Sequence, residues 1–254
     1  MPEIHHPLEA LEPKLLWQHF DTIRRIPRPS KHEEKIIECI KKWAADGGYE
    51  VLQDATGSMT IKVPATPGHE DAPTVILQGH VDMVCEKNSD VEHDFMTQGI
   101  EVEVVGDWVQ AKGTTLGADN GIALALALTL VEESAVVHPP LELLFTVDEE
   151  SGLLGAKNLD PELIDGHILL NIDSEEEGVF TIGCAGGGDS TMTLPLSRMD
   201  APVGTKPFTL KVSGLRGGVD DGRGGFTAVP SFNYSCSRDW IGLYGCHRRR
   251  QRPD

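Results

Sequence analysis

Several acidic residues and one histidine stand at the ends of apolar runs in this sequence. The runs lie in TVILQGHVDMV, TTLGADNGIALALAL, LELLFTVDEESG and HILLNIDSEEEG, and the polar residues are His80, Asp82, Asp119, Glu149, Glu150 and Asp173. An apolar run of four to eight residues between turn formers is typical of a buried strand. Open α/β sheets bind ligands at the carboxyl ends of their strands. We therefore expect these side chains to meet at one edge of a sheet, around a cation.

The residue types suit a divalent cation, because carboxylates and imidazoles bind zinc, manganese or cobalt. The spacing between His80 and Asp82 places both side chains on one side of an extended strand end. Asp82 can then accept a hydrogen bond from the His80 ring and fix the tautomer that binds metal. Asp119 stands in a turn of small residues before a helix, where its two oxygens can bridge two ions.

Glu149 and Glu150 can divide the remaining roles between them. Adjacent side chains of an extended chain point in opposite directions. One carboxylate can therefore bind a metal while its neighbour acts as general base on an activated water. Asp173 completes the set. Cations would offset the mutual repulsion of these acids, several of which would otherwise take up protons.

Each acid alone has a plainer interpretation as a loop residue or a helix cap. The three glutamates at 175–177 fit a solvated turn, and His32-Glu33-Glu34 lacks the second histidine of HExxH. The glycines at 186–188 lack the Lys-Ser/Thr of a phosphate-binding loop. The metal hypothesis therefore depends on the joint pattern, in which several elements end in the same chemistry.

Alternating helices and strands are expected to position these residues. Helical periodicity covers 8–26 and 31–46, with Ser30 as the N-cap of the second helix, and 119–134 is a nearly all-apolar helix. Gly106-Asp107 is a hairpin turn signal. Such alternation indicates an α/β sandwich. The strands are predicted at 49–53, 58–63, 73–79, 100–105, 108–111, 141–147, 168–172 and 178–183.

The composition and charge of the chain argue against some classes of binding partner. The 254 residues carry a formal net charge of −18, which argues against binding to nucleic acid or to an anionic membrane. The longest apolar stretch, 122–131, is too short to span a bilayer. The N-terminus has neither a basic start nor an apolar signal core. We therefore expect a cytoplasmic protein.

The last part of the sequence differs from the rest. Residues 219–254 contain six arginines and four aspartates, a net charge of +2, and four of the arginines stand within 248–252. The segment has no helical or strand period longer than a few residues. We predict that it does not continue the preceding fold.

Four long motifs resemble the aminoacyl-histidine dipeptidases (Xaa-His dipeptidases) of peptidase family M20. They are LQGHVDMV, KGTTLGADNGIA, TVDEESGLLGA and LNIDSEEEGVFTIGCAGG, and the resemblance covers about residues 8–218. It implies a zinc-peptidase-like, three-layer α/β/α sandwich with an inserted lid or dimerisation domain. It also implies two divalent metal ions, zinc in the first place, with manganese or cobalt as alternatives.

The resemblance also implies a role for each residue of the acidic set. His80 and Asp173 would hold one metal, Glu150 the other, and Asp119 would bridge them. Asp82 would orient His80, and Glu149 would be the general base. The implied reaction is hydrolysis of dipeptides, preferentially with C-terminal histidine, by a zinc-activated water. Other M20-type amidohydrolysis, as in a broad dipeptidase or an aminoacylase, is the alternative enzyme hypothesis.

The sequence departs from the family beyond Gly218. Family members are close to twice this length, and KVSGLRGG is followed here by Val219-Asp220 where the family has His-Ser-Gly. We expect residues 1–205 to form the first part of the catalytic domain, 206–218 the start of the lid, and 219–254 an aberrant tail from a truncation or frameshift. The chain would then keep one complete metal site. It could be a weakly active or inactive remnant, and loss of the lid argues against the family's homodimer.

Overall fold

The structure, a computed structural model, describes residues 7–174, 178–183 and 204. The chain divides into two compact units, Met1–Glu177 and Gly178–Asp254, and every helix and strand below belongs to the first. The expected domain boundaries at 205 and 218, and the predicted tail 219–254, lie outside the described residues. No helix in the described part of the chain is both long and apolar enough to cross a membrane.

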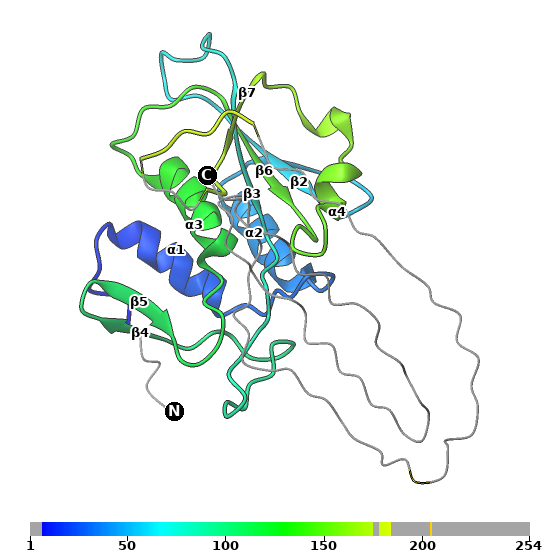
Figure 1. The fold of residues 1–254 in the computed structure, drawn as a ribbon. Coiled ribbons are helices and arrows are strands. Elements are labelled where there is room, and N and C mark those ends of the chain that lie inside the picture. Colours follow the sequence, from blue (N-terminus) through cyan, green and yellow to red (C-terminus); the bar gives the residue numbers. More distant parts are fainter. Residues whose placement is uncertain (1–6, 175–177, 184–203, 205–254) are drawn as a thin grey trace, which may run out of the picture. The chain divides into compact units, whose positions relative to one another are not determined.

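A mixed five-stranded sheet of order β1-β2-β6-β3-β7 carries the candidate site (Figure 1). The strands β6, β3 and β7 run parallel, and β2 is antiparallel to both of its neighbours. The three parallel strands therefore end at the same edge. A separate hairpin, β4 and β5, turns at Gly106. The bounds are Glu50–Gln53 (β1), Met59–Val63 (β2), Val75–His80 (β3), Val102–Val105 (β4), Trp108–Ala111 (β5), Leu141–Thr146 (β6) and Ile168–Asn171 (β7).

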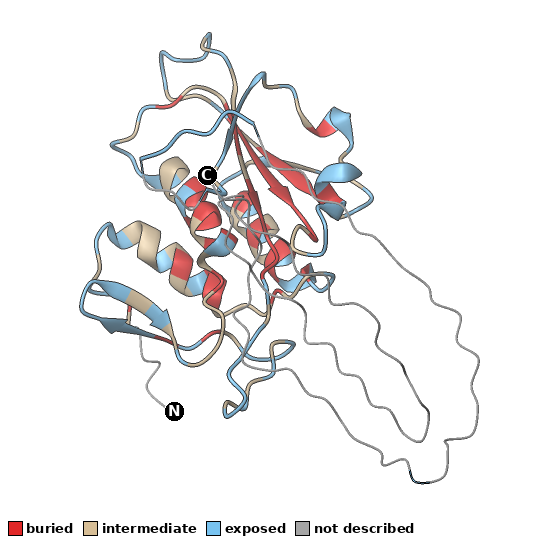
Figure 2. Ribbon diagram, in the orientation of Figure 1, coloured by how far each residue is buried: buried red, intermediate tan, exposed pale blue. Residues whose placement is uncertain are grey.

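Three longer helices pack with one face of the sheet into a single hydrophobic core. Alternate residues of β2 and β6, among them Ile61 and Leu143, join the inward residues of the helices in this core, which Figure 2 shows as buried. Alternation follows from the strand period of two. The helices are α1 (Lys14–Arg24), α2 (Glu34–Asp46), α3 (Ala118–Glu132), the short α4 (Leu154–Lys157) and the 3₁₀ turn η1 (Pro161–Leu163).

The predicted α/β architecture is confirmed, and the differences from prediction lie mainly at element ends. The first helix begins at Lys14, because Pro13 precedes it in an extended conformation and residues 8–12 form a turn and a bend. The short elements α4 and η1 were not predicted. The predicted strand at 178–183 is wrong: Phe180 and Ile182 are almost fully exposed there, and no described strand pairs with them.

The opposite face of the sheet contains an ion pair in which the carboxylate is buried and the lysine is partly exposed. Lys62 Nζ lies 2.6 Å from Glu142 Oε1 and 3.0 Å from Asp165 Oδ2. Glu142 is 2% exposed and also accepts hydrogen bonds from the backbone N–H groups of Asp165 and Gly166. The pair lies at the start of β6, far from the strand ends that carry the candidate site.

Replacing Lys62 by Met should lower the free energy of unfolding by about 3 kcal/mol, because the buried Glu142 carboxylate loses its cationic partner. Urea unfolding measures the loss. Lys42→Met is the matched control. The Lys42–Asp46 pair is exposed on both sides, so its removal should change the same quantity by about 0.5 kcal/mol or less. Equal losses in the two variants would show that the Lys62 pair is no more than a surface contact.

Candidate metal centre

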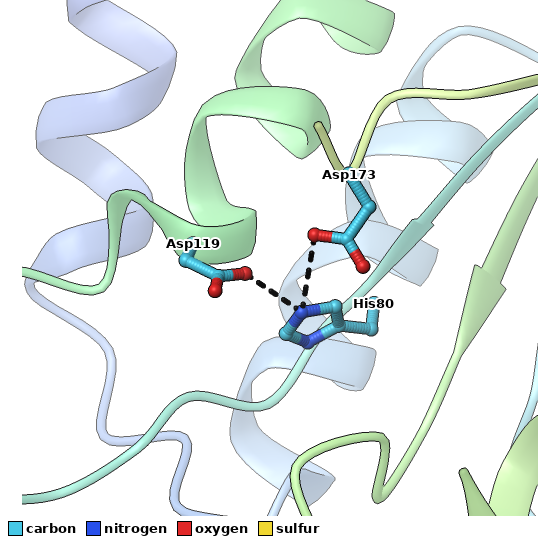
Figure 3. Close-up of side chains that lie close together, drawn as sticks. All are labelled: His80, Asp119 and Asp173. Atoms are coloured by element: carbon cyan, nitrogen blue, oxygen red, sulfur yellow. Dashed lines mark hydrogen bonds and ion pairs between the residues drawn. The ribbon is translucent and has the colours of Figure 1, made fainter. Parts of the chain in front are cut away.

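One buried histidine lies between two carboxylates at the ends of parallel strands. His80 is the last residue of β3 and is 1% exposed. Its Nε2 is hydrogen-bonded to Asp119 Oδ1 at 3.0 Å and lies 3.8 Å from Asp173 Oδ1 (Figure 3). Asp119 comes from the start of α3 and Asp173 from the segment after β7, so three separate parts of the chain supply these side chains.

Asp82 lies behind the histidine, on the side of Nδ1. Its Oδ1 is 3.3 Å from His80 Nδ1, which is long for an N–H···O hydrogen bond, so we treat the contact as mainly electrostatic. Asp82 is fully buried and accepts hydrogen bonds from the Ser30 hydroxyl and from the backbone N–H groups of Glu149 and Glu150. These donors hold its carboxylate beside the imidazole.

Glu149 and Glu150 both face the histidine, which corrects the expectation that they point apart. Each offers one oxygen, and these two oxygens and a His80 ring nitrogen all lie within 4.8 Å of one another. The Glu149 Oε2 atom is 3.9 Å from Nε2. The alternation of an extended strand does not apply here, because β6 ends at Thr146 and Asp148 has a positive φ of 51° that turns the chain.

The charges around His80 set its protonation in the absence of a cation. Burial by itself lowers the pKa of His80, but its interactions with Asp119 and Asp82 and the charge of Asp173 raise that pKa to about 10. Burial by itself raises the pKa of Asp82, but His80, the Ser30 hydroxyl and the Glu149 N–H lower it to about 2. Without a metal ion, the protonated His80 ring therefore supplies the positive charge among these acids.

Glu149 and Glu150 respond to the same crowding in the opposite direction. Burial, with the charges of Asp173 and Asp82, raises the pKa of Glu149 against the pull of His80. Burial and the charge of Asp119 raise the pKa of Glu150 to about 7. Neighbouring acids favour the protonated form of each carboxyl group. A bound cation favours the ionised form instead, so this cluster suits a cation. One imidazole with several carboxylates is also a donor set that zinc or manganese accepts.

Asn120 connects the three loops and was not predicted as a site residue. Its Oδ1 accepts a hydrogen bond from the His80 N–H at 3.1 Å, and its Nδ2 donates to Ile172 O at 2.9 Å and Asp173 Oδ1 at 3.0 Å. The peptide bond between Asp119 and Asn120 is cis. The only sequence signal was the position of Asn120 directly after a candidate ligand.

Ser30 and Glu33 also support the centre, in roles that the sequence did not indicate. Ser30 is not the cap of α2, which begins after Glu33 without a side-chain cap. The Ser30 hydroxyl donates instead to Asp82, at 2.7 Å. Glu33 is buried, and its Oε1 accepts the Asp148 N–H at 2.9 Å. The segment before α2 therefore fixes the turn that carries Glu149 and Glu150.

Several known proteins of similar sequence and structure are peptidases. Cytosol non-specific dipeptidase of Escherichia coli (strain K12) is 47% identical over 215 residues, which are 85% of this chain and 44% of that protein. The crystal structure of aminoacylhistidine dipeptidase from Vibrio alginolyticus is 49% identical, with a TM-score of 0.66 over 70% of this chain and 36% of that chain. No family model matches the sequence.

The chain is similar to both dipeptidases over the part of their length that it covers. Aminopeptidase PepT from Bacillus cereus is a more distant relative, 27% identical with a TM-score of 0.55 over 64% of this chain and 44% of that chain. The chain spans less than half the length of these three relatives. The structure brings together the six residues selected from the sequence, and the role of each remains a proposal.

Gly79→Ala tests how closely β3 and α3 must approach. A Cβ at position 79 would lie 2.4 Å from Asn120 Oδ1 and 3.2 Å from Ala123 Cβ. We expect the variant to lose about 1–3 kcal/mol of unfolding free energy, because Asn120 must move away from the His80 N–H. In the double variant with Asn120→Ala the clash with the Asn120 side chain is absent. Its loss should therefore be smaller than the sum of the two single losses in urea unfolding, whereas additive losses would contradict the contact.

The stability of the metal-free protein should fall as pH rises from about 5 to 10. The pKa values of Glu150 and His80 are raised in the folded state, to about 7 and about 10. The folded chain therefore binds more protons than the unfolded chain in this range, and the free energy of unfolding decreases with pH. Thermal unfolding of the chelator-treated protein at several pH values measures the trend.

Two variants test whether Glu150 causes the lower part of that pH dependence. Glu150→Gln should flatten the profile between about pH 5 and 7, because the group that takes up the proton is removed. Glu38→Gln, at an exposed position of α2, should leave the profile unchanged. A melting temperature that stays constant or rises over this range in the metal-free protein would show that the acids do not crowd His80 as the distances indicate.

Proposed function

We propose that this chain carries a metal centre for the hydrolysis of dipeptides. The observation that supports it most is the position of His80 Nε2, 3.0 Å from Asp119 and 3.8 Å from Asp173 at the ends of parallel strands. Imidazole with carboxylates on two sides is an arrangement that binds a divalent cation. The dipeptidase names of two relatives support the reaction class.

The geometry favours one tightly held ion among the described residues. Two of the three groups of candidate ligands use the same imidazole, one with Asp119 and Asp173 and the other with Glu149 and Glu150, and the third contains carboxylates alone. The second ring nitrogen of His80 faces Asp82. A second ion would therefore receive only carboxylates from the described part of the chain, and carboxylates alone hold zinc more weakly than a site with imidazole.

The residues would divide the reaction among them. A bound divalent ion supplies Lewis acidity for the scissile carbonyl and makes a neighbouring water more acidic. Asp82 holds the imidazole in orientation, and Asp119 and Asp173 complete the binding group, with Glu150 as a further ligand. Glu149 takes a proton from the attacking water and returns it to the leaving amine. Burial raises the pKa of Glu149, which makes its carboxylate a stronger base.

The names of the two dipeptidases also bear on which dipeptides this chain would prefer. We infer a preference for dipeptides with C-terminal histidine, because one relative is an aminoacylhistidine dipeptidase. The other is named a non-specific dipeptidase, which supports the broader alternative. The cytosolic name of that relative also supports a cytoplasmic location.

Glu149→Gln in the 254-residue chain separates proton transfer from metal binding. The variant should bind zinc with the stoichiometry of the unchanged chain, close to one per chain. It should hydrolyse dipeptides at least about 100-fold more slowly, because the amide cannot accept a proton. Zinc is measured after gel filtration, and turnover is measured on the same fractions with Xaa-His and Xaa-Ala dipeptides and an N-acetyl amino acid.

The outcomes separate the hypotheses. Equal turnover of all three substrate classes would contradict the histidine preference. Zinc binding without turnover in the unchanged chain would favour an inactive remnant. Failure of the unchanged chain to bind zinc would contradict the metal centre itself.

A further inference from the structure

Arg28 is a buried cation next to the metal centre that no step of the proposed reaction uses. It is 1% exposed and lies between α1 and α2. Its Nη1 donates to Val81 O at 2.9 Å and to Asp82 O at 2.7 Å, and its Nη2 donates to Gly117 O. Three backbone carbonyls therefore share one guanidinium.

These carbonyls belong to the two loops that carry the candidate ligands. Val81 and Asp82 directly follow His80, and Gly117 lies two residues before Asp119. Gly117 is also the N-cap of α3 and has a left-handed backbone. The hydrogen bonds of Arg28 thus set how far the loop after β3 can lie from the turn before α3.

Two glycines leave the space that this contact needs. A Cβ added at Gly117 or at Gly121 would lie 2.7 Å from Arg28 Nη2. Backbone contacts link the same two segments. Met83 N donates to Arg28 O at 3.2 Å, and Pro29 forms a parallel bridge with Met83. The segment before α2 therefore contacts the loop after β3 through both the Arg28 side chain and the backbone.

Only a guanidinium meets the geometry. Its planar fork can donate in several directions at once, whereas a lysine ammonium is a compact charge on a flexible stem. An apolar side chain of equal length would fill the volume but would leave the carbonyls of Val81, Asp82 and Gly117 without this donor, which is unfavourable for buried groups. Burial lowers the pKa of Arg28 to about 10, against the opposing charge of Asp82, so the group stays cationic at neutral pH.

We propose that Arg28 is a positioning residue of the metal centre, which fixes the spacing between His80 and Asp119 by joining the carbonyls of their two loops. The inference rests on the proposed function in one respect, that the centre binds a divalent cation. Arg28 itself contacts neither the imidazole nor the ligand carboxylates in the hydrogen bonds described.

Arg28→Lys and Gly121→Ala test the proposal from two directions in the full chain. The first replaces the fork, and the second retains Arg28 but displaces its Nη2. Gly121 lies in α3 without a positive φ, so alanine there also favours the helix. Both variants should bind zinc about 10- to 100-fold more weakly in calorimetric titration, as expected when groups that orient ligands are lost. Both should also change the visible spectrum of the cobalt-loaded protein.

Lys62→Met is the control for a general loss of stability. It removes a cation that partners a buried carboxylate at the other end of β6, so it should leave the zinc affinity and the cobalt spectrum unchanged. If Arg28→Lys does not fold, Gly121→Ala decides. A folded Arg28→Lys or Gly121→Ala variant with the zinc affinity and cobalt spectrum of the unchanged chain would overturn the proposal.

Hydrogen exchange separates this inference from the proposed function. In the metal-free chain, peptides covering residues 79–84 and 115–121 should exchange faster in both the Arg28 and Gly121 variants than in Lys62→Met, which reports the effect of a general loss of stability. Unchanged exchange in these two segments would overturn the positioning role even if the centre binds zinc. Failure of the unchanged chain to bind zinc, with faster exchange in the variants, would contradict the proposed function alone.

Discussion

The crowding of carboxylates around one buried imidazole is the constraint on which this structure depends. His80 has Asp82 on one ring nitrogen and Asp119 on the other, with Asp173 and Glu149 within 4 Å of the latter. Like charges at such distances repel, and burial strengthens the repulsion. Without fixed donors the acids would separate or take up protons. The surrounding fold therefore has to hold them in place before any cation binds.

Donors from distant parts of the chain provide that support. Ser30 donates to Asp82, Asn120 accepts from the His80 backbone and donates to Asp173, and Arg28 joins the loops of His80 and Asp119. Each contact links segments that are 40 or more residues apart. Such polar contacts contribute little net stability when buried. Their physical effect is to allow one arrangement of the ligands.

Among the parallel strands, β7 is less covered by other parts of the described chain than β3 and β6. The side chains of Ile168, Leu169 and Leu170 in β7 are 45–48% exposed, although parallel strands are usually covered on both faces. Asp173 follows this strand. The described residues of β7 thus receive less packing than those of β3 and β6. The hydrogen bond from Asn120 Nδ2 joins the segment after this strand to the start of α3.

Periodicity and ligand chemistry in the sequence were enough to predict the α/β architecture and the six polar residues that meet at the sheet edge. That prediction works because parallel strands place their carboxyl ends together, so residues after apolar runs converge whatever the details of the loops. The resemblance to a dipeptidase family assigned roles that spacing alone left open. The end of β6 was different, because the positive φ of Asp148 turns Glu149 and Glu150 to the same side.

Only the tertiary structure revealed Arg28, Ser30, Glu33 and Asn120 as supports of the centre. Their types carry no local signal: Ser30 looked like a helix cap, and an isolated arginine or asparagine looks like a surface residue. Their partners are carbonyls, N–H groups and carboxylates brought near by folding, at sequence separations from 40 to 115 residues. A local pattern shows which residues can bind a cation. The long-range contacts decide how those residues are held, because they exist only after the strands have paired.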